Sequence, residues 1–172
     1  MIRFVSPLLR LVDRVSAPAT VSAHCDIPCG IYDPHAAQIA ALTVLRMDQL
    51  IGNLQMAGGE KGQLDTYANS LGRYITVKEQ HAEIFKKEID ILWHDYFRPE
   101  HLEKYPDLHN IFWNANKLAS RNKQNIDAGA AEELLAASNR IAEIFWETKG
   151  VATRKAASNQ AVGGELVYVD NR

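Results

Sequence analysis

The chain has 172 residues, of which 47% are hydrophobic and 23% charged, the composition of an ordinary globular domain. Its 19 basic and 21 acidic side chains nearly balance, so the totals carry no sign of a nucleic-acid-binding surface. No apolar run reaches about 18 residues, so we expect no membrane-spanning helix. The two cysteines, Cys25 and Cys29, exclude a disulfide scaffold and lie in one short segment.

Residues 1–23 differ in character from the rest of the chain. Arg10, Asp13 and Arg14 interrupt their apolar stretch, which makes them a poor secretory signal, although Val-Ser-Ala before His24 is typical of a cleavage site. An export signal is therefore the less favoured alternative to a cytoplasmic leader or a plain disordered tail. Removal of the segment would leave 16 basic and 20 acidic side chains, a net charge of −4.

Four amphipathic helices follow, each recognised by apolar residues at 3.6-residue spacing. The first begins at Asp33-Pro34, where an aspartate before a proline is a strong helix-start signal. The expected helices span 33–54, 64–96, 108–119 and 134–145, and Asp127 would cap the last of them.

Helices of this kind, joined by short connections, predict an all-α fold, an antiparallel up-down four-helix bundle over residues 24–149. The tail, residues 150–172, contains a Gly-Gly pair and a short β-prone stretch, ELVYV. We expect this tail to be flexible.

The segment HCDIPCGIYDP, residues 24–34, carries the distinctive chemistry. Pro28 and Gly30 favour a turn, whereas small buried cysteines would need a helix or strand around them. A zinc site is disfavoured because the chain has no second cysteine pair. A disulfide across the loop stays open as an alternative.

His24 turns this segment into a metal hook if it becomes the N-terminus. Its α-amine, together with the backbone nitrogen and thiolate of Cys25, would close two five-membered chelate rings. Cys29 would add a second thiolate, and the His24 imidazole could reach an axial position. This planar N2S2 set suits Ni(II) or Cu(II). The amine exists only after cleavage before His24, so the leader would act as an activation switch.

The hook His24-Cys25-Asp26-x-Pro28-Cys29-Gly30-x-Tyr32-Asp33-Pro34 resembles that of nickel-containing superoxide dismutases. Further matches are KEQHAEI at 78–84, LWHDYFRPEHLEKYPDLH at 92–109 and IFWETK at 144–149. The resemblance implies a four-helix-bundle subunit in a homohexamer, with one nickel ion per subunit. It also implies disproportionation of superoxide to oxygen and hydrogen peroxide, with nickel cycling between Ni(II) and Ni(III).

The resemblance also implies roles for individual hook residues. His24, Cys25 and Cys29 would be the nickel ligands and, with Tyr32 as a gate beside the metal, the catalytic residues. Asp26 would hold the hook by hydrogen bonds. Pro28 would shape the hook through a cis peptide bond, a geometry that fixes a tight turn.

Two positions depart from the family pattern. Where the family commonly has a Glu and an Arg that orient the axial imidazole, this chain has Ala40 and His81. Groups that orient a metal ligand tune affinity and activity, so His81 is the candidate replacement. Arg98 stands where the family tends to have a lysine near the substrate approach, and we expect it to steer superoxide electrostatically.

Two other functions stay open. A helical-bundle nickel or copper carrier would use the same hook without efficient turnover. It is favoured if Ala40 and His81 leave the site able to bind metal but unable to turn over. A redox sensor would form a Cys25–Cys29 disulfide without any need for nickel. The expected partners are superoxide and a processing peptidase for the leader, with no nucleic acid and no membrane span.

Overall fold

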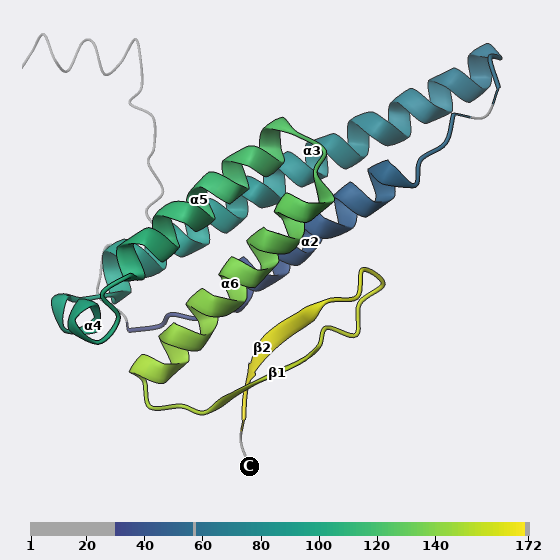
Figure 1. The fold of residues 1–172 in the computed structure, drawn as a ribbon. Coiled ribbons are helices and arrows are strands. Elements are labelled where there is room, and N and C mark those ends of the chain that lie inside the picture. Colours follow the sequence, from purple (N-terminus) through teal and green to yellow (C-terminus); the bar gives the residue numbers. More distant parts are fainter. Residues whose placement is uncertain (1–29, 57, 171–172) are drawn as a thin grey trace, which may run out of the picture.

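The computed structural model describes residues 30–56 and 58–170 of the chain, so the predicted ligands His24, Cys25 and Cys29 lie outside the described residues. Four long helices run alternately up and down, and a β-hairpin lies beside them (Figure 1). The elements are α2 (His35–Gly52), α3 (Lys61–Ile91), the π-helical turn η2 (Leu92–Tyr96), α4 (Pro99–Lys104), α5 (Leu108–Gln124), α6 (Ala128–Thr148), β1 (Thr153–Ala157) and β2 (Glu165–Val169).

The predicted antiparallel four-helix bundle is confirmed. The apolar stripes of α2, α3, α5 and α6 meet in one core, which combines alanines with larger aliphatic and aromatic side chains. The α2–α3 pair projects beyond α5 and α6 at the end of the bundle away from α4 (Figure 1). The fully buried core residues include Ala41, Val44, Phe85, Ile89, Ala115, Ala119, Leu134 and Phe145.

The helix ends follow local capping chemistry. Before α2, the Asp33 carboxylate accepts a hydrogen bond from the backbone N–H of His35 at 2.7 Å, and Pro34 is the capping residue. Before α6, the predicted cap is confirmed, because the Asp127 side chain accepts from the N–H of Ala130 at 3.0 Å. No described helix is long and apolar enough to cross a bilayer.

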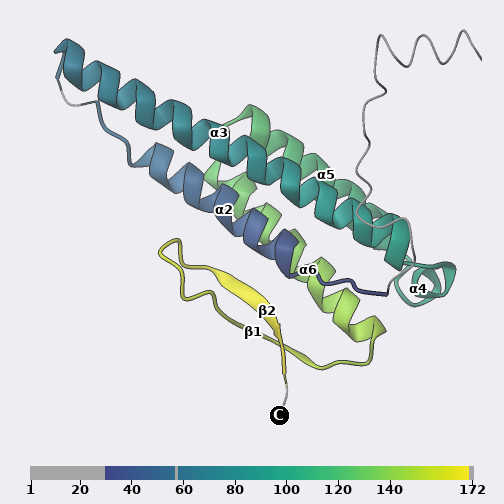
Figure 2. The same cartoon turned by 180° about the vertical axis from the view of Figure 1, so that it is seen from behind.

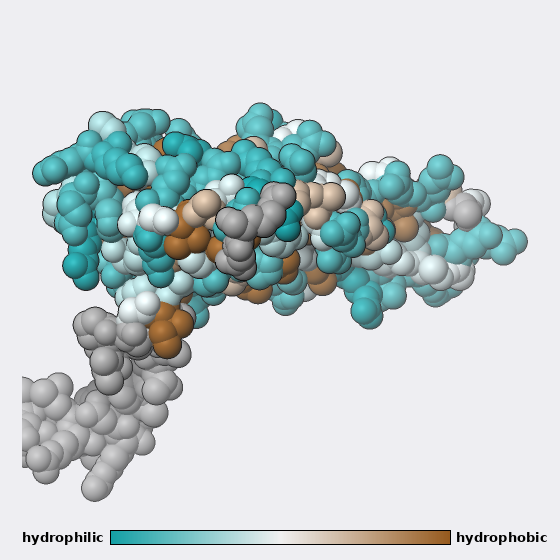
Figure 3. Space-filling view, turned by 90° about the horizontal axis from the view of Figure 1, so that it is seen from below, coloured by the Kyte–Doolittle hydropathy of each residue, from teal (hydrophilic) through white to brown (hydrophobic). Residues whose placement is uncertain are grey.

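The tail expected to be flexible is instead an antiparallel hairpin in which Thr153 pairs with Val169 and Ala157 with Glu165. Figure 2 shows it alongside α2 and α6, on the side away from α3 and α5. Burial explains its order, because Leu166 and Val167 are only 1% and 2% exposed. The face of the molecule on the hairpin side is mostly hydrophilic, with hydrophobic areas in separate places (Figure 3).

The turn of the hairpin needs its Gly-Gly pair. Gly163 and Gly164 adopt φ angles of +76° and +74°, a region that residues with a Cβ rarely enter. A Cβ on Gly164 would also lie 3.1 Å from Cδ2 of Leu135, so the turn sits directly on α6.

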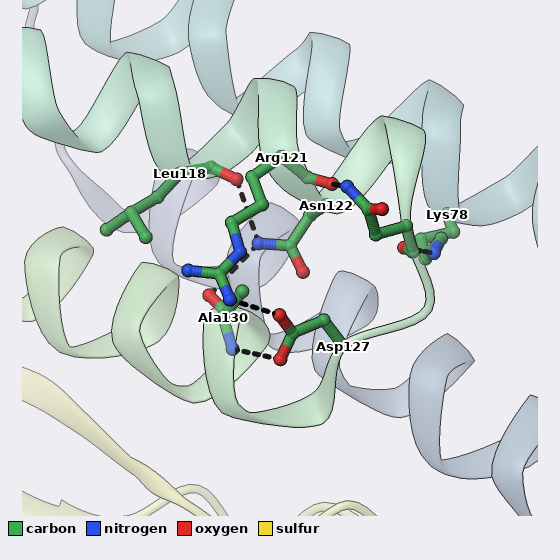
Figure 4. A network of polar contacts seen from close by, with 7 residues as sticks. Lys78, Leu118, Arg121, Asn122, Asp127 and Ala130 are labelled. Atoms are coloured by element: carbon green, nitrogen blue, oxygen red, sulfur yellow. Dashed lines mark hydrogen bonds and ion pairs between the residues drawn. The ribbon is translucent and has the colours of Figure 1, made fainter.

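A buried ion pair joins α2 to α3. The Lys78 ammonium lies 3.0 Å from Oδ1 of Asp48, and the two side chains are 2% and 0% exposed. Lys78 also donates to the backbone carbonyl of Asn125 in the α5–α6 connection (Figure 4). Within the described chain, neither Asp48 oxygen accepts a hydrogen bond, so the Lys78 charge is what compensates this carboxylate.

The same connection carries a second set of polar contacts (Figure 4). The buried Asn122 amide donates to the carbonyls of Leu118 and Ala130 at 2.9 and 3.0 Å. Arg121 pairs with the Asp127 carboxylate at 2.5 Å. These bonds close the turn between α5 and α6.

We predict that Lys78→Met lowers the free energy of unfolding by about 3 kcal/mol or more, because it leaves the Asp48 carboxylate buried without a charge partner. Urea unfolding followed by circular dichroism measures this. The double variant Asp48→Leu/Lys78→Met removes both charges and should recover most of the loss. A double variant as unstable as the single one would contradict this account.

We predict that Asp127→Ala lowers Tm at pH 7, with a loss that shrinks on acidification. The Ala130 N–H and the Arg121 guanidinium hold the pKa of Asp127 below its ordinary value. Its stabilisation is therefore complete above the unfolded-state pKa and is lost as pH falls through the lower native pKa. Thermal melts from pH 7 to pH 3 test this. The control is Asp107→Ala, since Asp107 precedes α5 without a side-chain bond to the helix backbone.

Candidate functional site

The described chain begins at the end of the predicted hook. Of the predicted hook and ligand residues, His24, Cys25, Asp26, Pro28 and Cys29 lie outside the described residues, and the last of the hook's predicted site residues, Tyr32, lies within them.

Tyr32 packs against the end of the second long helix. Its ring is half-buried, and its centroid lies 5.6 Å from that of Tyr96, the last residue of η2. The π-helical turn η2 ends with the N–H of Phe97 donating to the carbonyl of Leu92 at 3.0 Å. Such turns insert an extra residue into a helix and often mark functional sites.

Tyr96 is itself held firmly by its surroundings. Its hydroxyl shares a hydrogen bond of 2.6 Å with the Thr148 hydroxyl at the end of α6. Its ring lies 4.6 Å from that of Phe145 and stacks on His101 at 5.6 Å, with an angle of 17° between the planes. Tyr96 therefore presents a fixed surface to Tyr32.

A cavity of about 380 Å³ opens between Tyr32 and the end of the bundle. It brings together two of the predicted site residues, Tyr32 and Arg98, although α2 and α3 separate them in the sequence. The cavity has two cations and two carboxylates on its wall. Its lining is Gly30, Tyr32, Asp95, Tyr96, Arg98, Glu100, His101 and Lys149.

Lys149 also lines this cavity, and the sequence analysis did not predict it as a site residue. Its ammonium lies 4.6 Å from the ring centroid of Phe145 and 5.5 Å from that of Tyr96. Aromatic faces attract a cation without neutralising it. Among the described residues, Lys149 and Arg98 form no ion pair. The signal was present in the sequence, because Lys149 ends the quoted IFWETK match.

His81 and Ala40 lie elsewhere in the described chain. Ala40 is 2% exposed and belongs to the core. His81 is half-buried on α3, with Nδ1 2.9 Å from the carbonyl of Val77, and it does not line the cavity at Tyr32. The predicted contact of His81 with His24 falls on a residue outside the described chain.

No second metal site appears among residues 30–56 and 58–170, where no three His, Cys, Asp or Glu side chains come together. His94 contacts the carbonyl of Asp90 at 2.7 Å, and His109 packs beside Trp93 at 5.6 Å. The predicted metal donors remain those of the hook, the two thiolates and the nitrogens of His24 and Cys25. This donor set fits nickel.

The profile of the nickel-containing superoxide dismutase family matches residues 19–149. The chain belongs to this family. The hook motif, the helical matches and the cavity at Tyr32 all fall in the matched span. The prediction of this family is confirmed, and with it that of an oxidoreductase with nickel as its cofactor.

Named relatives and solved structures agree with this. The chain is 40% identical to the superoxide dismutase [Ni] of Streptomyces coelicolor and 39% identical to that of Streptomyces seoulensis, each over 140 residues, 81% of this chain and 98% of the relative. A native nickel superoxide dismutase structure aligns with a TM-score of 0.62 and 36% identity, covering 73% of this chain and 99% of that one.

Proposed function

We propose that the chain, cleaved before His24, disproportionates superoxide at nickel held by His24, Cys25 and Cys29. One superoxide loses an electron and leaves as oxygen, and a second gains that electron and two protons to become hydrogen peroxide. When bound, nickel supplies the one-electron redox step between Ni(II) and Ni(III). The observation that carries the proposal is the family match, which spans both the hook and the cavity.

In this proposal, Tyr32 closes one side of the approach to the metal. Its ring lies against Tyr96, whose hydroxyl is engaged by Thr148. Tyr96 therefore acts through its ring, by holding Tyr32 in place. Asp26 and Pro28 would shape the hook ahead of this contact, and His81 would orient the His24 imidazole. The nickel or copper carrier is the less favoured function, because the family is one of enzymes.

Assembly and processing also belong to the proposal. The resemblance of the hook supports a homohexamer, with one nickel ion per subunit. A peptidase would remove residues 1–23 and so create the amine that the metal needs. The charged residues that interrupt the apolar stretch of the leader, Arg10, Asp13 and Arg14, support a cytoplasmic location.

We predict that protein from a nickel-replete host begins at His24 and carries one nickel per subunit. Intact mass and elemental analysis measure this, and electron paramagnetic resonance should show a rhombic Ni(III) signal. The uncleaved chain is the control and should lack both the signal and superoxide turnover, because its His24 nitrogen is an amide. Cleaved, nickel-loaded protein without turnover would instead support the carrier.

We also propose that Arg98 and Lys149 together attract superoxide to the cavity. Asp95 and Glu100 line the same cavity, so the two cations offset two carboxylates there. Without them the cavity would be negative and would repel a superoxide anion. The net charge of −4 on the cleaved chain makes such a local offset more important.

We predict that Arg98→Gln/Lys149→Gln lowers kcat/KM several-fold at low ionic strength, as measured by pulse radiolysis. The sign of the salt dependence should also change, because added salt would screen a repulsion and raise the rate constant of the variant. The control is Lys117→Gln, which removes a lysine held 4.5 Å from the ring of Trp113, outside the cavity. Equal effects of the two changes would contradict local steering.

A further inference from the structure

The C-terminal hairpin follows the span 19–149 that matches the family, yet it contacts the helix that carries the hook. Gln38, in the first turn of α2, is 1% exposed. Its Nε2 donates to the carbonyl of Val167 at 3.2 Å, and its Oε1 accepts from the N–H of Val167 at 2.7 Å. One side-chain amide thus satisfies both backbone groups of a strand residue that lies 129 positions away.

Gln38 is connected to the end of the hook segment by hydrogen bonds in the first turn of α2. The backbone N–H of Gln38 donates to the carbonyl of Pro34 at 3.2 Å, and Pro34 is itself buried. In the same turn, the Asp33 carboxylate accepts a hydrogen bond from the N–H of His35. The turn that Gln38 fixes is therefore the one from which residues 24–33 extend.

The hairpin has a separate anchor on α6. The Asn139 amide, 6% exposed, donates to the carbonyl of Glu165 at 2.9 Å. Lys155 pairs with Glu143 at 2.9 Å. These contacts hold the hairpin to α6 and do not involve α2. Gln38 and Asn139 are therefore two buried amides that bind the same strand to different helices.

We propose that the hairpin is a positioning element for the metal hook. It acts through Gln38, which ties the first turn of α2 to β2 and so fixes the base of the hook. The ring contact between Tyr32 and Tyr96 holds the same segment to the end of η2. Gln38 is a positioning residue, since it acts through the backbone of α2. The inference rests on the nickel ligands proposed above.

The test compares Gln38→Leu with Asn139→Leu in the full cleaved chain. Both changes remove one buried amide of the hairpin, so both should lower Tm. Only Gln38→Leu should loosen the hook, and we expect its nickel to pass to a chelator about 10-fold faster than in the parent protein. It should also broaden the Ni(III) paramagnetic resonance signal, whereas Asn139→Leu should leave the nickel release rate within about two-fold of the parent.

Two further measurements keep the outcome decisive. Hydrogen exchange of the nickel-free chain should speed up at the amides of 35–40 in Gln38→Leu and not in Asn139→Leu. Gln38→Glu keeps the acceptor for Val167 and loses the donor, so it should fall between parent and Gln38→Leu. Equal nickel release from both leucine variants would overturn the inference. Failure of the parent protein itself to bind nickel would overturn the proposed function instead.

Discussion

The register of α2 against α3 sets the rest of the structure, and the buried pair of Asp48 and Lys78 fixes that register. Asp48 lies 13 residues after the start of α2, and Lys78 lies 13 residues before the end of α3. At about 1.5 Å per residue, both helices therefore run about 20 Å from the pair to the same end of the bundle. Tyr32 precedes α2 and Tyr96 ends η2, so this equality of length places the two rings side by side.

The candidate site is thus built from residues at the ends of helices, and these residues are far apart in the sequence. The segment before α2 supplies Tyr32, the turn after α3 supplies Tyr96 and Arg98, and the end of α6 supplies Lys149. A sliding of one helix by a single turn would move a side chain by about 5.4 Å, more than the ring contact can absorb. A buried ion pair is a suitable lock, because a shifted register would leave a charge buried and unpaired.

Much of this could be predicted from the sequence, and the failures have physical reasons. The four helices follow from apolar spacing, and Asp127 is a local cap whose partner lies three residues away. The hook motif identified the family because its predicted donors, His24, Cys25 and Cys29, lie within six residues of the sequence. The order of the hairpin could not be predicted, since two strands alone are marginal in water and these depend on Gln38 and Asn139. Lys149 was missed because the IFWETK match does not show that its last residue lies at the cavity beside Tyr32.

The departures at Ala40 and His81 place more weight on the base of the hook. Ala40 is in the core, where a carboxylate would need a partner to offset its burial. In the proposed function, the His24 imidazole lacks one orienting partner, a carboxylate at position 40, so the backbone that carries it gains importance beside His81. That backbone extends from the first turn of α2, which Gln38 ties to β2. It includes Tyr32, whose ring packs on Tyr96. Rigid attachment of the hook would thus add to the orienting contact proposed for His81, and this would give a hairpin beyond the family's span a use in this chain.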